Sequence, residues 1–211
     1  MKLIGNFLSP YVRRVAISLN TVGLPYELQS LFVFKEPDAV RAYNPVVRIP
    51  TLVLDDNDVL VESYAILDEI DQMVGPEKAL CPPHGVERRQ VMKLTAIALA
   101  SMEKAQWAFY EPRFRPPEKV HQPWIDHNDQ QVLGGFRYLD GVSRKLGARR
   151  WLAGTDHISQ ADITAAVAFA FAKIVRPNLE LSPQFPDLAR FSERCEALEA
   201  FRAAPIPALP S

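Results

Sequence analysis

The chain has 211 residues, of which 48% are hydrophobic and 23% are charged, so it is long enough to bury a core and its composition does not require disorder. A formal net charge of -1 gives no long-range field for nucleic acid or an anionic membrane, and we expect neither as a partner. The two cysteines and four histidines show no metal-ligand spacing, and no signal peptide or membrane-spanning run is visible, so we expect no metal and a cytoplasmic location.

The first part of the chain alternates short strand-like runs with helical patterns, which is typical of a sheet covered by helices. A helix is expected after Ser9, with apolar residues at helical spacing until Gly23, and a second helix is expected from Ser63. Strands are expected at residues 2–5, 25–28, 51–54 and 59–61. This order predicts a small α/β domain over residues 1–77.

A proline-rich stretch between Gly75 and Gly85 marks a linker, because proline blocks regular structure. Beyond it the apolar period is helical throughout, which predicts an all-helical domain over residues 87–211. Ser159 and Asp162 have the spacing of an N-terminal capping box, which predicts a helix start at this point. The helix that follows is apolar nearly all round and is therefore expected in the middle of a bundle.

The first motif with chemical potential is Ser9-Pro10-Tyr11, between the first strand and the first helix. Serine followed by proline commonly starts a helix, so the simplest interpretation is a structural cap. A thiol ligand at this point would meet the positive end of the helix dipole and could accept a hydrogen bond from the Ser9 hydroxyl. Both effects favour thiolate over thiol.

The second motif runs from Asn44 to Leu52, where Pro50 immediately precedes a strand. A strand-entry proline in the trans form is the ordinary interpretation, since only about 5–6% of such bonds in folded proteins are cis. A cis Pro50 would instead turn the backbone N–H and C=O of Ile49 outward, where they could hold an extended peptide ligand.

The third motif is Glu62-Ser63, at the junction of the last strand and the second helix. Alone, this dipeptide is most simply interpreted as an N-cap serine with an acidic residue near the positive end of the helix dipole. The functional alternative is that Ser63 and the helix N-terminus bind a carboxylate, while Glu62 accepts a hydrogen bond from an α-amino group.

In this order and spacing the three motifs resemble those of the cytosolic glutathione transferase superfamily, of the serine type, and the resemblance extends over essentially the whole chain. It implies a thioredoxin-like N-terminal domain with a mixed four-stranded sheet, followed by a helical bundle that binds the second substrate. By the same resemblance Ser9 activates the glutathione sulfur and Ile49, before cis Pro50, pairs with the cysteinyl backbone. Glu62 and Ser63 then hold the γ-glutamyl end, and Arg48 reaches the glycyl carboxylate. Where family members usually have Asn-Pro-x-Gly-Lys-Val-Pro, this chain has Val47, Arg48 and Ile49.

The resemblance implies glutathione as co-substrate, a small electrophile as its target, a role in detoxification, and a homodimer. Since position 9 is serine, which cannot exchange disulfides, the chemistry expected is attack of the glutathione thiolate on an electrophile. Tyr11 is an alternative to Ser9 as the donor to the sulfur. The electrophile pocket is expected to draw on Phe7 and Tyr11 from one domain and on Trp107, Tyr110 and Arg113 from the other.

Two alternatives remain open at this point. In one, the same fold is a non-catalytic binding protein that holds glutathione weakly or not at all. In the other, the enzyme uses glutathione for isomerisation or dehalogenation rather than conjugation.

Overall fold

The computed structural model describes residues 1–146 and 151–207, and the chain divides into two compact units. One unit consists of Met1–Pro83 together with residues 197–207, and the other consists of the described residues between His84 and Glu196. The expected helical domain, 87–211, therefore differs from the observed unit at its end. The end of the chain belongs to the first unit because it contacts helix α1 (Pro10–Val22), where Nε of Arg13 donates to the C=O of Ala204 at 2.8 Å.

The first unit is built on a mixed four-stranded sheet with strand order β2-β1-β3-β4, which confirms the expected fold class. The strands are β1 Lys2–Ile4, β2 Glu27–Gln29, β3 Thr51–Val53 and β4 Val59–Val61. Strand β1 is parallel to β2 and antiparallel to β3, and β3 is antiparallel to β4 with Thr51 opposite Val61. This register places the residues just before β3 close to those just after β4.

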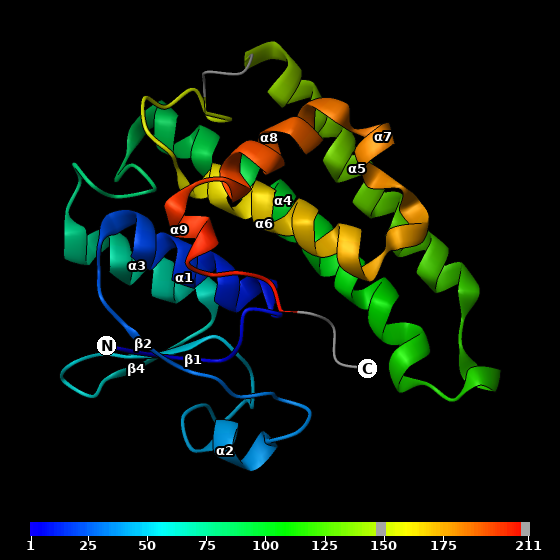
Figure 1. The fold of residues 1–211 in the computed structure, drawn as a ribbon, viewed down its shortest axis with the longest axis horizontal. Helices are drawn as coiled ribbons and strands as arrows, with labels where there is room; N and C mark the ends of the chain where they lie inside the picture. Colours follow the sequence, from blue (N-terminus) through cyan, green and yellow to red (C-terminus); the bar gives the residue numbers. More distant parts are fainter. Residues whose placement is uncertain (147–150, 208–211) are drawn as a thin grey trace. The chain divides into compact units, whose positions relative to one another are not determined.

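Helices cover both faces of this sheet: α1 and α3 lie on one face and α2 on the other (Figure 1). The helices of this unit are α1 Pro10–Val22, α2 Pro37–Arg41, α3 Ser63–Val74 and α9 Glu199–Arg202. Helix α1 starts where the sequence predicts, with Ser9 as N-cap and Pro10 in the first turn, and it ends at Gly23, whose φ of 77° is left-handed. Helix α9 packs against α1.

More residues of α1 are buried than its helically spaced apolar residues alone would predict. Val12 and Val15 are buried as expected, but Arg13, Arg14 and Ser18, which lie off that apolar face, are buried as well. The guanidinium of Arg13 contacts the C-terminal segment, with its Cζ 5.8 Å from the centre of the Phe201 ring. Helix α1 is therefore a central element of its unit.

The second unit is a helical bundle, as expected. Its elements are α4 Gly85–Phe114, η1 Pro117–Lys119, α5 Gln122–Leu146, α6 Gln160–Val175, η2 Pro177–Leu179, α7 Leu181–Gln184 and α8 Pro186–Glu196. Helix α4 packs against both α5 and α6, and α8 packs against α5 and α6. Pro112 is accommodated in the last turn of α4. None of the helices in the described part of the chain combines the length and apolar character needed to cross a bilayer.

The predicted capping box is present at the start of α6. The Asp162 carboxylate accepts a hydrogen bond from the Ser159 N–H at 2.8 Å, and Ser159 in turn caps the Asp162 N–H. The other carboxylate oxygen accepts the Leu152 N–H at 2.7 Å. Asp162 is completely buried, and this burial raises the pKa of its carboxyl, although the hydrogen bonds from Ser159 and Leu152 act in the opposite direction. This structural element ties the chain before α6 to the helix.

Candidate functional site

The structure places Ser9 at the opening turn of α1 with its hydroxyl available to a ligand. The loop before it is held by Asn6, whose side-chain amide donates to the C=O of Leu31 at 2.8 Å. The Ser9 Oγ accepts a long hydrogen bond of 3.4 Å from the Val12 N–H, so Ser9 caps the N-terminus of α1. The Ser9 O–H has no acceptor among the described residues, and the side chain is half-buried. A single hydroxyl can therefore cap α1 and donate to a ligand atom at the same time.

The peptide bond between Ile49 and Pro50 is cis. The preceding loop is organised by the buried Asn44, whose amide donates to the Arg48 C=O and whose Oδ1 accepts the Val46 N–H, both at 2.9 Å. In the part of the chain that the structure describes, neither the N–H nor the C=O of Ile49 makes a hydrogen bond. Since buried or edge backbone groups are normally paired, these two are open to an extended ligand.

Val47, where family members usually have glycine, has a φ of 55° and so occupies the left-handed region. This conformation favours glycine, and a β-branched residue adopts it at a cost in free energy. Glu62, across the β3–β4 end of the sheet, also has a positive φ of 68°. Residues held in such conformations cluster at ligand sites, because the surrounding structure must impose them.

Glu62 and Ser63 lie at the N-terminus of α3, but Ser63, expected as the N-cap, is the first residue of the helix. Glu62 is the N-cap residue, but its side chain makes no capping hydrogen bond and is exposed. Ser63 is buried, and its Oγ accepts a 3.4 Å hydrogen bond from Nη1 of Arg14. Its own O–H has no acceptor within the described residues. The free N–H groups of the first turn of α3 and this hydroxyl together can receive a carboxylate.

Arg14 is a functional candidate that the sequence analysis did not identify. Its side chain is 1% exposed, and no carboxylate of the described residues pairs with it. Its Nε has no hydrogen-bond partner, so the guanidinium is buried with unused donors. Burial lowers the pKa of Arg14 to about 10, while nearby Tyr11 acts in the opposite direction, so Arg14 stays protonated at neutral pH. An uncompensated buried cation behind a helix N-terminus favours an anion in front of it.

No sequence signal marked this arginine, because Arg13 and Arg14 are adjacent and only the fold distinguishes them. Arg13 is used to anchor the C-terminal segment, whereas Arg14 points to Ser63. The proximity of Tyr11 to Arg14 also bears on the choice between Ser9 and Tyr11, since it gives the phenol a neighbour other than a ligand.

Arg48 forms an ion pair with Glu62, with Nη1 and Oε1 3.0 Å apart. The two side chains are 57% and 49% exposed, so the pair lies at the surface of the first unit. The expectation that Arg48 reaches a glycyl carboxylate stays a prediction. The observed partner of its guanidinium is the residue expected to bind the opposite end of the tripeptide.

The residues expected to form the electrophile pocket belong to different units. Phe7 and Tyr11 lie in the first unit and are half-buried. On α4, Trp107 is exposed and Tyr110 is half-buried, with its hydroxyl accepting from Gln106 at 2.8 Å. The guanidinium of Arg113 lies 5.2 Å from the centre of the Phe109 ring, so this arginine has an aromatic partner on its own helix. A pocket shared by these residues remains a prediction.

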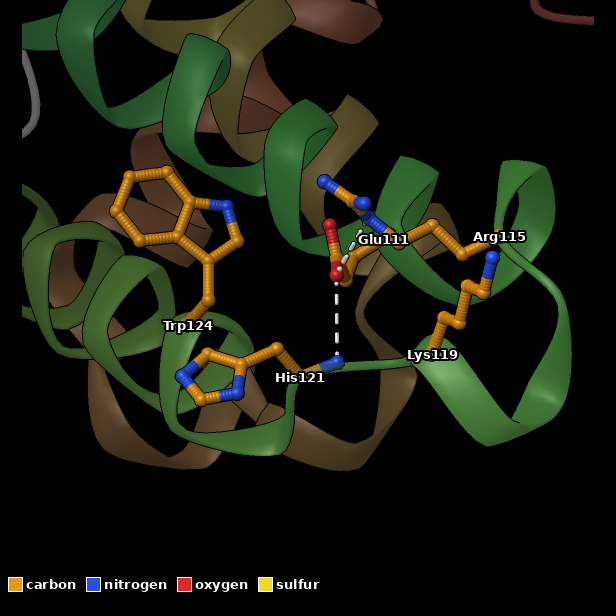
Figure 2. Close-up of a pocket in the computed structure, with 5 residues that line it drawn as sticks. All are labelled: Glu111, Arg115, Lys119, His121 and Trp124. Atoms are coloured by element: carbon orange, nitrogen blue, oxygen red, sulfur yellow. Dashed lines mark hydrogen bonds and ion pairs between the residues drawn. The ribbon is translucent and has the colours of Figure 1, made fainter.

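The second unit contains a separate hollow of about 330 Å³ at the junction of α4, η1 and α5 (Figure 2). Its lining residues are Glu111, Arg115, Lys119, His121 and Trp124. Glu111 accepts hydrogen bonds from Nε of Arg115 at 2.8 Å and from the His121 N–H at 3.2 Å, and Figure 2 marks both contacts. The carboxylate thus joins the end of α4 to the start of α5, and Arg115 is engaged in this structural contact.

No group of three or more histidine, cysteine or acidic side chains within the described residues is arranged to hold a metal ion. Cys81 and Cys195 are both buried. The pKa of the Cys195 thiol is raised far above its usual range, chiefly by burial, and the nearby Asp162 acts in the same direction. Cys195 is therefore not a reactive thiolate.

Two family models match the chain: the N-terminal domain of glutathione S-transferases over residues 3–78 and the C-terminal domain of the same proteins over residues 98–199. Together with the fold, these matches define the class of protein. The chain belongs to the cytosolic glutathione S-transferase superfamily.

Individual relatives agree with this assignment. A maleylpyruvate isomerase of a Ralstonia species is 28% identical, and the match covers 100% of this chain and 99% of the relative. A crystal structure of a glutathione transferase family member from Pseudomonas fluorescens with bound glutathione is 28% identical, with a TM-score of 0.85 and coverage of 98% and 99% of the two chains. A Methylobacterium radiotolerans glutathione transferase in complex with glutathione sulfonate is 27% identical, with a TM-score of 0.87 and coverage of 100% and 96%.

Proposed function

We propose that this protein is a glutathione transferase that binds glutathione along the edge of the small sheet and uses its thiolate to attack a small electrophile. The observation that carries the proposal is the row of unsatisfied groups on one unit: the Ser9 hydroxyl, the backbone of Ile49, and the Ser63 hydroxyl backed by Arg14. Each matches one part of the tripeptide. The solved relatives with bound glutathione or a derivative support the same ligand.

In this proposal the cysteinyl residue of glutathione pairs with the N–H and C=O of Ile49, in the manner of an added strand. The pairing directs the sulfur to the opening turn of α1. There the Ser9 hydroxyl and the positive end of the helix favour the thiolate over the thiol, which ordinarily titrates near about 8.5. Ser9 is preferred to Tyr11 because the Ser9 O–H is free to donate, whereas Tyr11 lies near Arg14.

The γ-glutamyl carboxylate is held by Ser63, the first turn of α3 and the buried charge of Arg14, and the α-amino group is held by Glu62. The serine hydroxyl accepts from Arg14 and donates to the ligand, so the arginine polarises the serine. Binding the carboxylate also compensates a cation that the free protein leaves without a counter-ion.

Titration with glutathione by calorimetry tests the assignment of this site. The wild-type protein should bind, and Glu62→Ala should lose affinity because the α-amino group loses an ionic partner. The matched control is Glu193→Ala on α8, which removes the same charge in the other unit and should bind like wild type. Equal affinity for glutathione in all three proteins would show that the site is wrongly assigned.

Isomerisation is a second candidate, supported by the match to a maleylpyruvate isomerase over the whole chain. In that case the thiolate adds to the substrate and leaves again, so glutathione is not consumed. Product analysis with a conjugatable electrophile and with a cis-configured dicarboxylic enone distinguishes the two reactions. Turnover without loss of glutathione indicates isomerisation.

A further inference from the structure

The position of Arg48 is at odds with a role at the glycyl end of glutathione. Its Nη1 lies 3.0 Å from Oε1 of Glu62, the residue proposed to bind the α-amino group. An extended tripeptide places its two ends about 10 Å apart, at about 3.3–3.6 Å for each residue. While the ion pair is intact, one guanidinium cannot reach the glycyl carboxylate and remain on the residue that serves the opposite end.

The ion pair follows from the register of the sheet. Thr51 of β3 lies opposite Val61 of β4, so the chain just before β3 and the chain just after β4 emerge side by side. Arg48 comes three residues before Thr51, and Glu62 follows Val61 directly. The backbones on both sides of the contact are therefore positioned by the same antiparallel ladder.

The backbone on each side of the pair is also constrained. The C=O of Arg48 accepts the amide of Asn44 at 2.9 Å, and Asn44 is 1% exposed. Glu62 is fixed by its place at the start of α3, where its C=O accepts the Ile66 N–H at 3.1 Å. These backbone contacts do not fix the Glu62 side chain, which is 49% exposed and makes no capping hydrogen bond. Arg48 is the partner that orients it.

Resting on the proposed function, we infer that Arg48 is a positioning residue for the γ-glutamyl end of glutathione. It holds the Glu62 carboxylate where the α-amino group arrives, so that less side-chain freedom is lost on binding.

Glutathione analogues that each lack one charged group test this assignment by calorimetry. One probe is glutathione with its glycyl carboxylate converted to an amide; the other carries a glutaryl group in place of γ-glutamyl and so lacks the α-amino group. We expect Arg48→Gln to bind glutathione and the glycinamide about three- to tenfold more weakly than wild type, the range for one side chain losing its preorganisation. With the glutaryl analogue, wild type and Arg48→Gln should bind equally.

Three controls separate positioning from a general effect. Arg48→Lys keeps the charge and should restore most of the affinity. Arg190→Gln removes an exposed, ion-paired arginine from the second unit and should bind like wild type. In the Glu62→Gln background, adding Arg48→Gln should have no further effect, because the carboxylate that it orients is gone. At saturating glutathione kcat should match wild type, since Arg48 is proposed to act far from the sulfur.

The inference is overturned if Arg48→Gln weakens glutathione but binds the glycinamide as wild type does, since that pattern assigns Arg48 to the glycyl end. It is equally overturned if Arg48→Gln binds glutathione as tightly as wild type or more tightly. These outcomes leave the proposed function intact. A wild-type protein that binds no glutathione refutes the proposed function itself.

Discussion

Replacing Ser9 with alanine should raise the pKa of the thiol of bound glutathione by about one to two pH units. A hydrogen bond to a charged acceptor contributes about 1.5–3 kcal/mol, and each pH unit corresponds to about 1.36 kcal/mol. The N-terminus of α1 remains in place in this variant, so the rise should stop short of the pKa of free glutathione. Below the raised pKa a smaller fraction of bound glutathione is thiolate, and turnover at neutral pH falls accordingly.

The variant should remain folded, since the capping hydrogen bond that it loses is long at 3.4 Å. Removing a serine N-cap costs about 0.5–2 kcal/mol of unfolding free energy, which an ordinary domain tolerates. The assay is the ultraviolet absorbance of the bound thiolate, followed against pH at saturating glutathione. Ser9→Thr is the matched control, because it keeps both the hydroxyl and the cap.

The reasoning is refuted if Ser9→Ala and wild type show the same pKa for bound glutathione. If Tyr11→Phe raises the pKa and Ser9→Ala does not, the phenol is the donor to the sulfur. At pH values below the wild-type pKa of the bound thiol, glutathione affinity should change little in Ser9→Ala, since the backbone of Ile49 and the α3 N-terminus are untouched. A complete loss of binding would indicate a collapsed site rather than a missing hydrogen bond.

Three further outcomes are expected. Arg14→Met should weaken glutathione binding by about tenfold or more, because a charged hydrogen bond is lost. The midpoint of chemical denaturation should stay unchanged or rise slightly, because the free protein buries this charge without a counter-ion. A lower midpoint would contradict the proposed role. Asp162→Ala should lower the unfolding free energy by about 3 kcal/mol or more in urea titrations, since it leaves buried donors unpaired; an unchanged midpoint would refute this. Gly135→Ala should lower the melting temperature, because its Cβ would lie 1.9 Å from Oγ of Ser101. The loss should be smaller when Gly135→Ala is added to Ser101→Gly than when it is added to wild type, and an equal loss in both backgrounds would exclude the clash as the cause.

The Asp162 carboxyl also predicts a pH dependence of stability. Its pKa is raised in the folded protein, chiefly by burial, so the folded state holds this proton more tightly than the unfolded state does. The stabilisation from this proton is present below the ordinary carboxyl pKa and is lost as pH rises through the folded value. In Asp162→Asn this contribution disappears, and the difference in unfolding free energy between the two proteins should change over that pH window.

Local sequence determined the order of the elements and several of their ends. The Ser9-Pro10 start, Gly23 and the Ser159–Asp162 box depend on residues close together in the chain, and these are found as expected. The second strand, expected at residues 25–28, instead lies at Glu27–Gln29, and helix α2 was not predicted. The same short range revealed Glu62-Ser63 as a helix start with binding potential. Such features follow from backbone preferences and nearby hydrogen bonds, which need no knowledge of the rest of the molecule.

The tertiary structure alone decided which polar groups are left without partners and which charges meet. Arg13 and Arg14 are neighbours in the chain, yet one anchors the C-terminal segment and the other is buried behind Ser63. The pairing of Arg48 with Glu62 likewise depends on the register of β3 and β4. These contacts join residues far apart in the chain, and the free energy of each depends on burial that only the packed fold creates.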